Sequence, residues 1–335
     1  MSLIRSASVL AALAVPMAAA ACDLCAIYRA GDARGEQSSG LTFAIAEQFT
    51  AYGTEQFNGK EVHRQVTDRL DRSMTHVVAG WNFTDKLGLS LNLPVVHESY
   101  RFSDLENGLT PRRREGSETG IGDLAVVLRW QFLDQRAGDW SLTANLLGGV
   151  KLPTGDADHL DELEAGITRY ESIVGPGHDH DALGTVVSGV HLHDIALGSG
   201  SVDGILGVTG VARWKRGYFN AQAQHYLRTE GAGSYRTGDE TILSGGPGAF
   251  LWLSRVGTVS LQMNTSYETR GADEFRGKAS VHTGMTAWYA GPQLAFTWRS
   301  RFSALAGVDI PLRAAGRGFQ NVPDFRANAT LAWRF

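Results

Sequence analysis

The chain has 335 residues, 40 of them glycine, and a formal net charge of −4. This near-neutral balance excludes the basic surface that nucleic-acid binding requires, and we expect no nucleic-acid partner. Beyond the first 21 residues no stretch approaches about eighteen uninterrupted apolar residues, so the mature chain has no candidate transmembrane helix. The length is consistent with one large β domain.

Residues 1–21 predict a secretory signal peptide. The basic Arg5 precedes an apolar run at 9–17, and three alanines at 19–21 end the segment. A short apolar core with a basic start and small residues at its end is typical of a cleaved leader. The mature protein is therefore expected outside the cytoplasm.

The mature chain begins with a predicted periplasmic segment, 22–39, that carries the only two cysteines, Cys22 and Cys25. In an oxidising compartment they form a local disulfide or are an incidental pair. The same CxxC spacing also suits a metal or redox role. Acylation of Cys22 is a third interpretation, because three alanines precede it as in a weak lipobox.

Residues 40–335 predict an all-β domain, a transmembrane, antiparallel, up-and-down β-barrel of about twelve strands. In each strand bulky apolar residues alternate with small or polar ones, which gives the strand two unlike faces. The alternating runs are 41–49, 77–83, 87–95, 122–132, 140–152, 202–214, 218–227, 242–253, 258–268, 285–298, 302–312 and 324–335.

Short and long connections alternate along this domain. The short links are 84–86, 134–139, 215–217, 255–257 and 300–301, and the long polar links include 101–120, 153–202, 228–240 and 270–282. Outer-membrane barrels have short periplasmic turns and long extracellular loops. We therefore expect an integral protein of the outer membrane of a Gram-negative cell, with both termini periplasmic and with lipid and lipopolysaccharide around it.

The chain ends on an alternating strand that finishes with an aromatic residue. Leu331, Trp333 and Phe335 share one face, with small or polar residues between them. We expect the barrel-assembly machinery to recognise this strand. Aromatic residues also flank the short links, as in an interfacial girdle, namely Trp81, Trp130, Trp140, Trp214, Phe219, Trp298 and Phe302. A soluble β-sandwich has no reason to segregate its loops and aromatics in this way.

The link 153–202 is a predicted long, histidine-rich extracellular loop. His178 and His180, and then His191 and His193, form two His-x-His pairs with aspartates beside them. On an extended backbone, residues two apart point the same way, so each pair presents two imidazoles to one ion such as zinc or copper. Two other interpretations remain open: the histidines are solvated, or the second pair extends a strand beyond the membrane.

The polar faces and nearby loops carry charges of both signs. The predicted lumen-lining residues are Asp123, Arg129, Lys151, Asp203, Arg213, Arg228, Glu268, Asp309 and Arg326. Opposite charges can pair across a barrel of this size and leave a narrow path or none, which predicts weak charge selectivity. A run of three arginines at 112–114 either binds lipopolysaccharide phosphate or is a solvated loop.

No ordering of serine, histidine and aspartate predicts a hydrolase. His225 and His282 are the two histidines that a lumen serine would have to approach to imitate one. We therefore expect no enzymatic activity.

Four stretches resemble the outer-membrane family named for the meta-pathway of phenol degradation. They are TGIGDLAVVLRWQF (119–132), GVKLPTGD (149–156), LGSGSVDGILGV (197–208) and QHYLRTEGAGSYRTGDE (224–240). The resemblance implies a small β-barrel channel that transports aromatic or hydrophobic compounds, and it implies no catalytic residue. The CxxC and the histidine-rich insertion depart from the family pattern.

Together these features predict an outer-membrane channel or transporter whose cargo is small and aromatic or hydrophobic. The alternative is a metal-binding outer-membrane protein that uses the loop histidines and the periplasmic CxxC. A third hypothesis is a structural or porin-like partner of a periplasmic protein.

Overall fold

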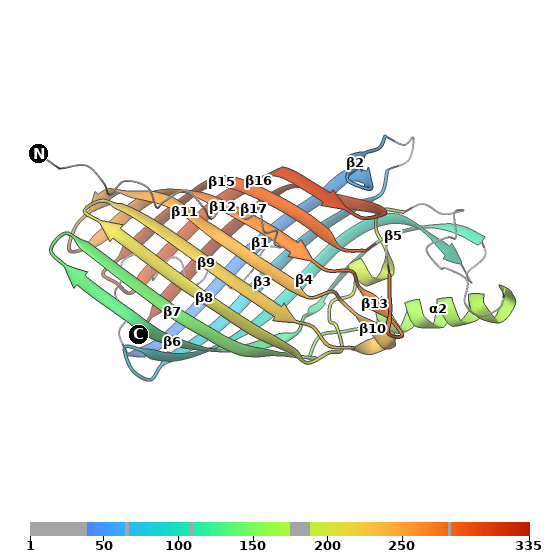
Figure 1. The fold of residues 1–335 in the computed structure, drawn as a ribbon, viewed down its shortest axis with the longest axis horizontal. Helices are drawn as coiled ribbons and strands as arrows, with labels where there is room; N and C mark the ends of the chain where they lie inside the picture. The colour runs from blue at the N-terminus through green and yellow to red at the C-terminus, as the bar shows by residue number, and fades with distance from the viewer. Residues whose placement is uncertain (1–38, 64–66, 107–109, 175–187, 281–282) are drawn as a thin grey trace, which may run out of the picture.

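The computed structural model describes residues 39–63, 67–106, 110–174, 188–280 and 283–335. The predictions for the signal peptide 1–21, Cys22, Cys25, His178, His180 and His282 concern residues outside these ranges. Within them, twelve wall strands close into an antiparallel barrel (Figure 1), which confirms the predicted fold class. No helix in the described part of the chain is both long and apolar enough to cross a membrane.

The wall strands neighbour one another in chain order, and β17 pairs with β1 to close the barrel. They are β1 (Gly40–Phe57), β3 (Arg69–Asn82), β4 (Leu87–Glu106), β5 (Thr110–Ile121) with β6 (Leu124–Ala137), β7 (Trp140–Leu152), β8 (Asp203–Trp214), β9 (Gly217–Leu227), β11 (Glu240–Leu253), β12 (Gly257–Arg270), β15 (Met285–Trp298), β16 (Phe302–Gly316) and β17 (Phe319–Arg334). Because β4 pairs with β5 along one half and β6 along the other, β5 and β6 form one interrupted strand.

Smaller elements gather at one end of the barrel (Figure 1). They are β2 (Lys60–Glu61), α2 (Asp158–Val174), η2 (Leu192–Asp194), η3 (Ala232–Ser234), β10 (Tyr235–Arg236), β13 (Glu274–Phe275) and β14 (Lys278–Ala279). We call this the long-loop end and the opposite one the short-turn end. The first and last strands meet at the short-turn end, where the Phe335 N–H donates to the Leu41 carbonyl at 2.9 Å.

Two long-loop connections differ from their predicted form. The polar stretch 101–120 is a hairpin in which β4 and β5 stay paired up to Glu106 and Thr110. Only Arg317 and Gly318 separate β16 from β17. In water, polar strands keep their backbone hydrogen bonds by pairing with each other, so strands can extend well past an apolar band.

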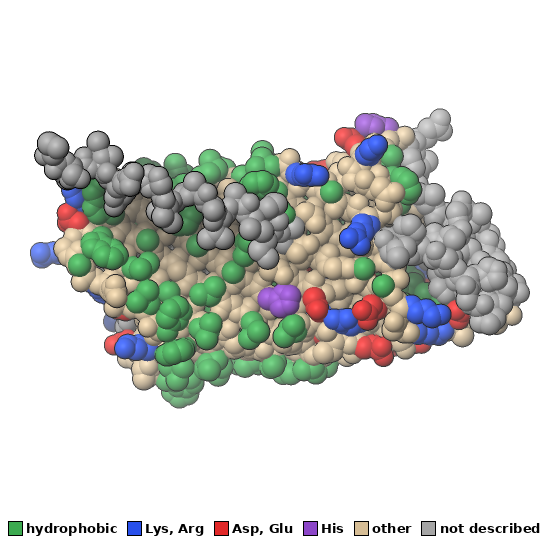
Figure 2. All heavy atoms as spheres, in the orientation of Figure 1, with side chains coloured by type: hydrophobic (Ala, Val, Ile, Leu, Met, Phe, Trp, Pro, Cys, Tyr) green, Lys and Arg blue, Asp and Glu red, His purple; other side chains and the backbone are tan. Residues whose placement is uncertain are grey.

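The two faces of the wall are chemically distinct. Outward residues of β15 such as Trp288, Leu294 and Trp298 are exposed, whereas inward residues such as Tyr289 and Gln293 are buried. Trp288 and Trp298 lie ten positions apart, which is ~33 Å along a strand and ~25 Å once the strand is tilted, the height of an outer-membrane apolar band. Figure 2 shows hydrophobic side chains over the barrel body and charged ones towards its ends.

Candidate functional site

The barrel interior contains a buried ion pair between two predicted lumen residues. Arg326 on β17 donates from both terminal nitrogens to Glu268 on β12, at 2.8 and 3.0 Å. The guanidinium also lies over the ring of Tyr289, 4.4 Å from its centroid. Both charged side chains are almost completely buried. This geometry matches the two-pronged Arg–carboxylate interaction that holds both groups in one orientation.

Other inward side chains bond across the interior. Arg129 donates to Asn145 at 3.1 Å and to Asn82 at 2.9 Å. The amides of Asn220 and Gln262 bond to each other reciprocally, at 2.9 and 3.0 Å. These groups are largely buried, and they form hydrogen-bonded polar clusters on the inner face of the wall.

Asp309 on β16 and Arg213 on β8 are two further predicted lumen residues. The Asp309 carboxylate accepts from Asn264 at 3.3 Å and from Asn328 at 3.4 Å. Arg213 lies on the same face of β8 as Asp203, next to the short turn that leads to β9.

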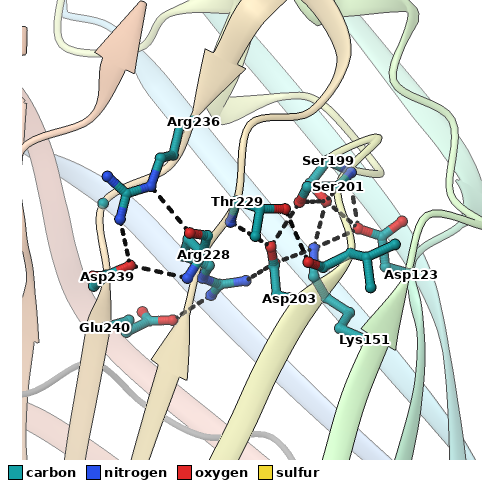
Figure 3. Close-up of polar contacts among 12 residues, drawn as sticks. Asp123, Lys151, Ser199, Ser201, Asp203, Arg228, Thr229, Arg236, Asp239 and Glu240 are labelled. Atoms are coloured by element: carbon teal, nitrogen blue, oxygen red, sulfur yellow. Dashed lines mark hydrogen bonds and ion pairs between the residues drawn. The ribbon is translucent and has the colours of Figure 1, made fainter. Parts of the chain in front are cut away.

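A second charged network lies at the long-loop end (Figure 3). Lys151 lies between two carboxylates, 2.7 Å from Asp123 and 2.8 Å from Asp203. Asp203 also accepts from Arg228 at 3.1 Å, and Arg228 continues to Glu240 at 2.5 Å. Every charge in this network has an oppositely charged neighbour. The network therefore links the ends of β7, β8, β9 and β11 at the barrel rim.

Two of the four family-like stretches, 119–132 and 149–156, meet at this rim. Thr154 donates to the Gly122 carbonyl at 3.1 Å, and Asp123 accepts from the Gly155 N–H at 3.0 Å. A Cβ on Gly155 would lie 2.8 Å from the Cα of Gly198, so a larger residue does not fit without displacing the backbone. The motifs thus form a joint that holds the end of the long link.

We call residues 188–199 the mouth segment. At its end, Ser199 donates to Asp123 from its N–H at 3.0 Å and from its hydroxyl at 2.6 Å. At its start, the Ser188 hydroxyl and the Gly189 N–H each donate to Asp68, at 3.0 Å. The segment is therefore fixed to two separate parts of the barrel rim.

Between these anchors the mouth segment buries apolar side chains. Val190, Leu192 and Ile195 pack against Leu70 of β3 and Phe102 of β4, and Ile195 has no exposed surface. Full burial of such a side chain is worth about 1.5–3 kcal/mol. These hydrophobic contacts add to the polar anchors that hold the mouth segment in place.

The second histidine pair lies in the mouth segment. The rings of His191 and His193 stack, with centroids 5.2 Å apart, and His193 also stacks on Tyr235 at 5.3 Å. Asp194 lies 3.4 Å from His191 Nδ1 and 3.6 Å from His193 Nε2. One potential ligand atom from each of the three lies within 4.8 Å of the others. Among the described residues these side chains form a candidate metal site.

The pKa values in this cluster are shifted. Burial lowers the pKa of His193 below its ordinary value. Burial alone would raise the pKa of Asp194, but the neighbouring His193 and His191 hold it well below its usual range. A neutral imidazole beside an ionised carboxylate is the protonation state that metal binding requires.

Of the interpretations left open for the second histidine pair, a strand that extends beyond the membrane does not fit, because residues 192–194 form the 3₁₀ turn η2. The Asp194 carboxylate accepts the His191 N–H at 2.9 Å and closes this turn. Helix α2 was not among the predicted elements, although Asp156 precedes it and accepts the Asp158 N–H at 2.9 Å, a standard helix-start signal.

The arginine run takes part in holding the loops. Arg114 pairs with Glu162 of α2, and this hydrogen bond holds the pKa of Glu162 below its ordinary value. Arg113 donates to the Thr67 carbonyl at 3.2 Å. At least two of the three guanidiniums therefore bind neighbouring loops.

His225 does not face the lumen. It shares the outward parity of Phe219 and Leu227 on β9, and its Nδ1 lies 2.9 Å from Thr241 Oγ1. His225 therefore does not lie where a lumen serine could approach it. In the part of the chain that the structure describes, His76 is a buried histidine of the interior, and its Nδ1 lies 3.1 Å from Asn92 Oδ1.

The sequence matches no protein-family model, and it matches no curated protein. The fold is similar to that of an outer-membrane channel from Pseudomonas putida F1, with 12% identity and a TM-score of 0.55 over 91% of this chain and 98% of that one. The translocator domain of the autotransporter NalP from Neisseria meningitidis is more distant, with 12% identity and a TM-score of 0.40 over 93% of each chain. At such identities the similarity establishes the fold alone, and the resemblance to the phenol meta-pathway family stays a prediction.

Proposed function

We propose that the protein is an outer-membrane channel that carries small hydrophobic or aromatic molecules and is held closed by its own mouth segment. The observation that carries the proposal is the mouth segment itself, which packs Leu192 and Ile195 against the wall and is anchored at both ends. No covalent bond in this arrangement has to break for the segment to move. A plug of this kind suits a gated pore.

The proposed class of cargo follows from the surfaces that would be exposed if the mouth segment moved away from the barrel wall. Leu70 and Phe102 on the wall, and Val190, Leu192 and Ile195 on the segment, are all apolar. A small aromatic molecule would replace these contacts without leaving polar groups unpaired. The resemblance in the family-like motifs supports the same class of cargo.

The proposed setting is the outer membrane, with the short turns and both termini in the periplasm. The exposed apolar band would contact lipid, and the charged long-loop end would contact lipopolysaccharide. The terminal strand, with Phe335 exposed, would be read by the barrel-assembly machinery.

Conductance and uptake test this proposal. The variant Leu192→Ser/Ile195→Ser removes buried apolar contacts from the mouth segment, so it should raise single-channel conductance in planar bilayers and speed uptake of naphthalene into vesicles. Ala165→Ser, at an exposed position of α2 in the same link, is the matched control and should behave as the parent does. If parent and double variant are both as impermeable as protein-free bilayers, the protein is not a channel.

A second candidate function is metal binding, which the convergence of His191, His193 and Asp194 favours. Two imidazoles and a carboxylate suit zinc, with water as a fourth ligand, or copper. The ion would fasten the mouth segment rather than act in a reaction. The predicted contributions of the first histidine pair and of the CxxC remain part of this proposal.

A further inference from the structure

Tryptophan is distributed unevenly over the outside of the barrel. Seven of the eight tryptophans lie close to the short turns with exposed side chains, namely Trp81, Trp130, Trp140, Trp214, Trp252, Trp298 and Trp333. The eighth, Trp288, lies near the opposite end of β15. Tryptophan prefers the headgroup level of a bilayer, where its ring meets acyl chains and its N–H meets water. This distribution is what we expect if the short-turn end lies among lipid headgroups.

Five aromatic rings at this end form one continuous cluster. Their strands β11, β15, β16 and β17 lie in one sector of the wall, with β12 between β11 and β15 (Figure 1). The ring centroids of Trp252 and Trp298 lie 6.4 Å apart, and those of Trp298 and Phe296 lie 6.2 Å apart. Phe302 continues the cluster, 6.3 Å from Phe296 and 5.4 Å from Trp333. The rings thus form a continuous apolar surface across the sector.

Three exposed arginines lie directly beyond these rings. Arg255 lies in the turn between β11 and β12, and Arg299 and Arg301 lie in the turn between β15 and β16. A backbone hydrogen bond joins the two turns, since the Arg299 N–H donates to the Val256 carbonyl at 2.6 Å. The Arg334 N–H donates to the Arg301 carbonyl at 2.7 Å, which ties the second turn to β17. We call the three arginines and the five rings the arginine–aromatic patch.

The strands and turns that carry the patch contain no acidic residue. Neither aspartate nor glutamate occurs in 241–267, 285–308 or 327–335. Short turns elsewhere on the barrel do carry carboxylates beside their cations. Asp134 lies 3.0 Å from Arg136, and Asp139 lies 3.9 Å from Lys215. Side chains at the short-turn end therefore carry an excess of positive charge in the sector of the patch.

The two parts of the patch fit two parts of one molecule. Guanidinium groups bind phosphate oxygens through paired N–H donors. The aromatic rings belong to the exposed apolar band, where acyl chains would contact them. An acidic protein in the aqueous phase would meet the arginines but would leave the rings uncovered. A phospholipid presents a phosphate and acyl chains side by side, so it matches the whole patch.

We propose that the arginine–aromatic patch is a binding site for an anionic phospholipid of the leaflet that surrounds the short turns. The phosphate binds Arg299 and Arg301, Arg255 adds positive potential, and the acyl chains lie along the rings. Phosphatidylethanolamine carries its own ammonium group, which offsets the charge of its phosphate, so the patch prefers phosphatidylglycerol. The inference rests on the membrane setting of the proposed function, and it depends neither on the cargo nor on the mouth segment.

Native mass spectrometry of the protein in detergent micelles measures the binding of single lipids. The parent should bind phosphatidylglycerol more tightly than phosphatidylethanolamine of the same acyl chains. Arg299→Gln/Arg301→Gln should weaken phosphatidylglycerol binding about thirtyfold, because each cation near an anionic lipid contributes roughly a factor of five. Lys215→Gln/Arg216→Gln is the matched control, since it removes two cations from another short turn beside Trp214, and it should bind phosphatidylglycerol as the parent does.

Two results of this measurement overturn the proposal: equal affinity of the parent for the two lipids, or unchanged phosphatidylglycerol affinity in Arg299→Gln/Arg301→Gln. Glycerol 3-phosphate tests whether the acyl chains matter, because it carries the phosphate without them. It should not displace phosphatidylglycerol at millimolar concentration. Displacement would reveal a site for soluble phosphate and would overturn the lipid site.

Brominated lipids give a second readout, in vesicles and without any substitution. Bromine on an acyl chain quenches the fluorescence of tryptophans that it contacts. In vesicles of one fixed mixture of the two phospholipids, brominated phosphatidylglycerol should quench more per bromine than brominated phosphatidylethanolamine. Equal quenching would overturn the proposal. Neither readout involves transport, so a failed conductance and uptake test overturns the channel, whereas equal binding of the two lipids overturns the patch.

Discussion

Breaking the buried ion pair between Glu268 and Arg326 should strongly destabilise the barrel. Glu268→Gln keeps the side-chain volume but removes the negative charge, so the guanidinium stays in the interior without a counter-charge. Breaking a buried pair on one side costs about 3–5 kcal/mol of unfolding free energy. We expect the lower end, about 3 kcal/mol, because the amide oxygen of glutamine still accepts one of the two hydrogen bonds.

The double variant Glu268→Leu/Arg326→Met should cost much less than either charge removal alone, since no unpaired charge remains. It loses the contact between Arg326 and the Tyr289 ring, worth about 1 kcal/mol or more. A double-mutant cycle should therefore show strong coupling between the two positions.

Urea unfolding from lipid vesicles, followed by the fluorescence of the eight tryptophans, measures these free energies. Glu115→Gln is the control, because it removes the same charge from a solvent-exposed pair with Arg101 at 2.8 Å and should leave the unfolding midpoint unchanged. The reasoning is refuted if Glu268→Gln unfolds at the same urea concentration as the parent.

Three further outcomes are expected. Phe335→Ser removes the terminal lipid-facing aromatic and should lower the amount of heat-modifiable, assembled barrel on a gel; equal assembly would contradict a role for this residue as a signal. His191→Ala/His193→Ala should abolish most zinc binding in equilibrium dialysis. Parent binding should fall on acidification because protonated imidazole cannot coordinate, and replacement of both cysteines, which are expected on the opposite side of the membrane, should leave the loop site nearly unchanged. Gly198→Val should make the link 153–202 more sensitive to protease than the parent's, because a Cβ there collides with the Gly155 backbone.

The strands of the barrel wall could be predicted because the alternation of apolar and polar residues lies within each strand. In runs such as 87–95 and 258–268, side-chain alternation fixes the strand, its two faces and its approximate ends without knowledge of any neighbour. The inward positions of Arg129 and Glu268 follow from the same parity. Their partners do not, because Arg326 is far from Glu268 in sequence and meets it only when the barrel closes.

The structure of the mouth segment could not be predicted, because its contacts are with residues far away in the sequence. Alternation cannot describe residues 188–199, whose apolar side chains bind a wall on the opposite side of a long link. The open alternatives for His191 and His193 treated them as solvated or strand-forming, whereas the turn at Leu192 places their rings in a stack. Helix α2 could have been predicted, because an aspartate, Asp156, stands just before an amphipathic stretch and such a residue commonly begins a helix.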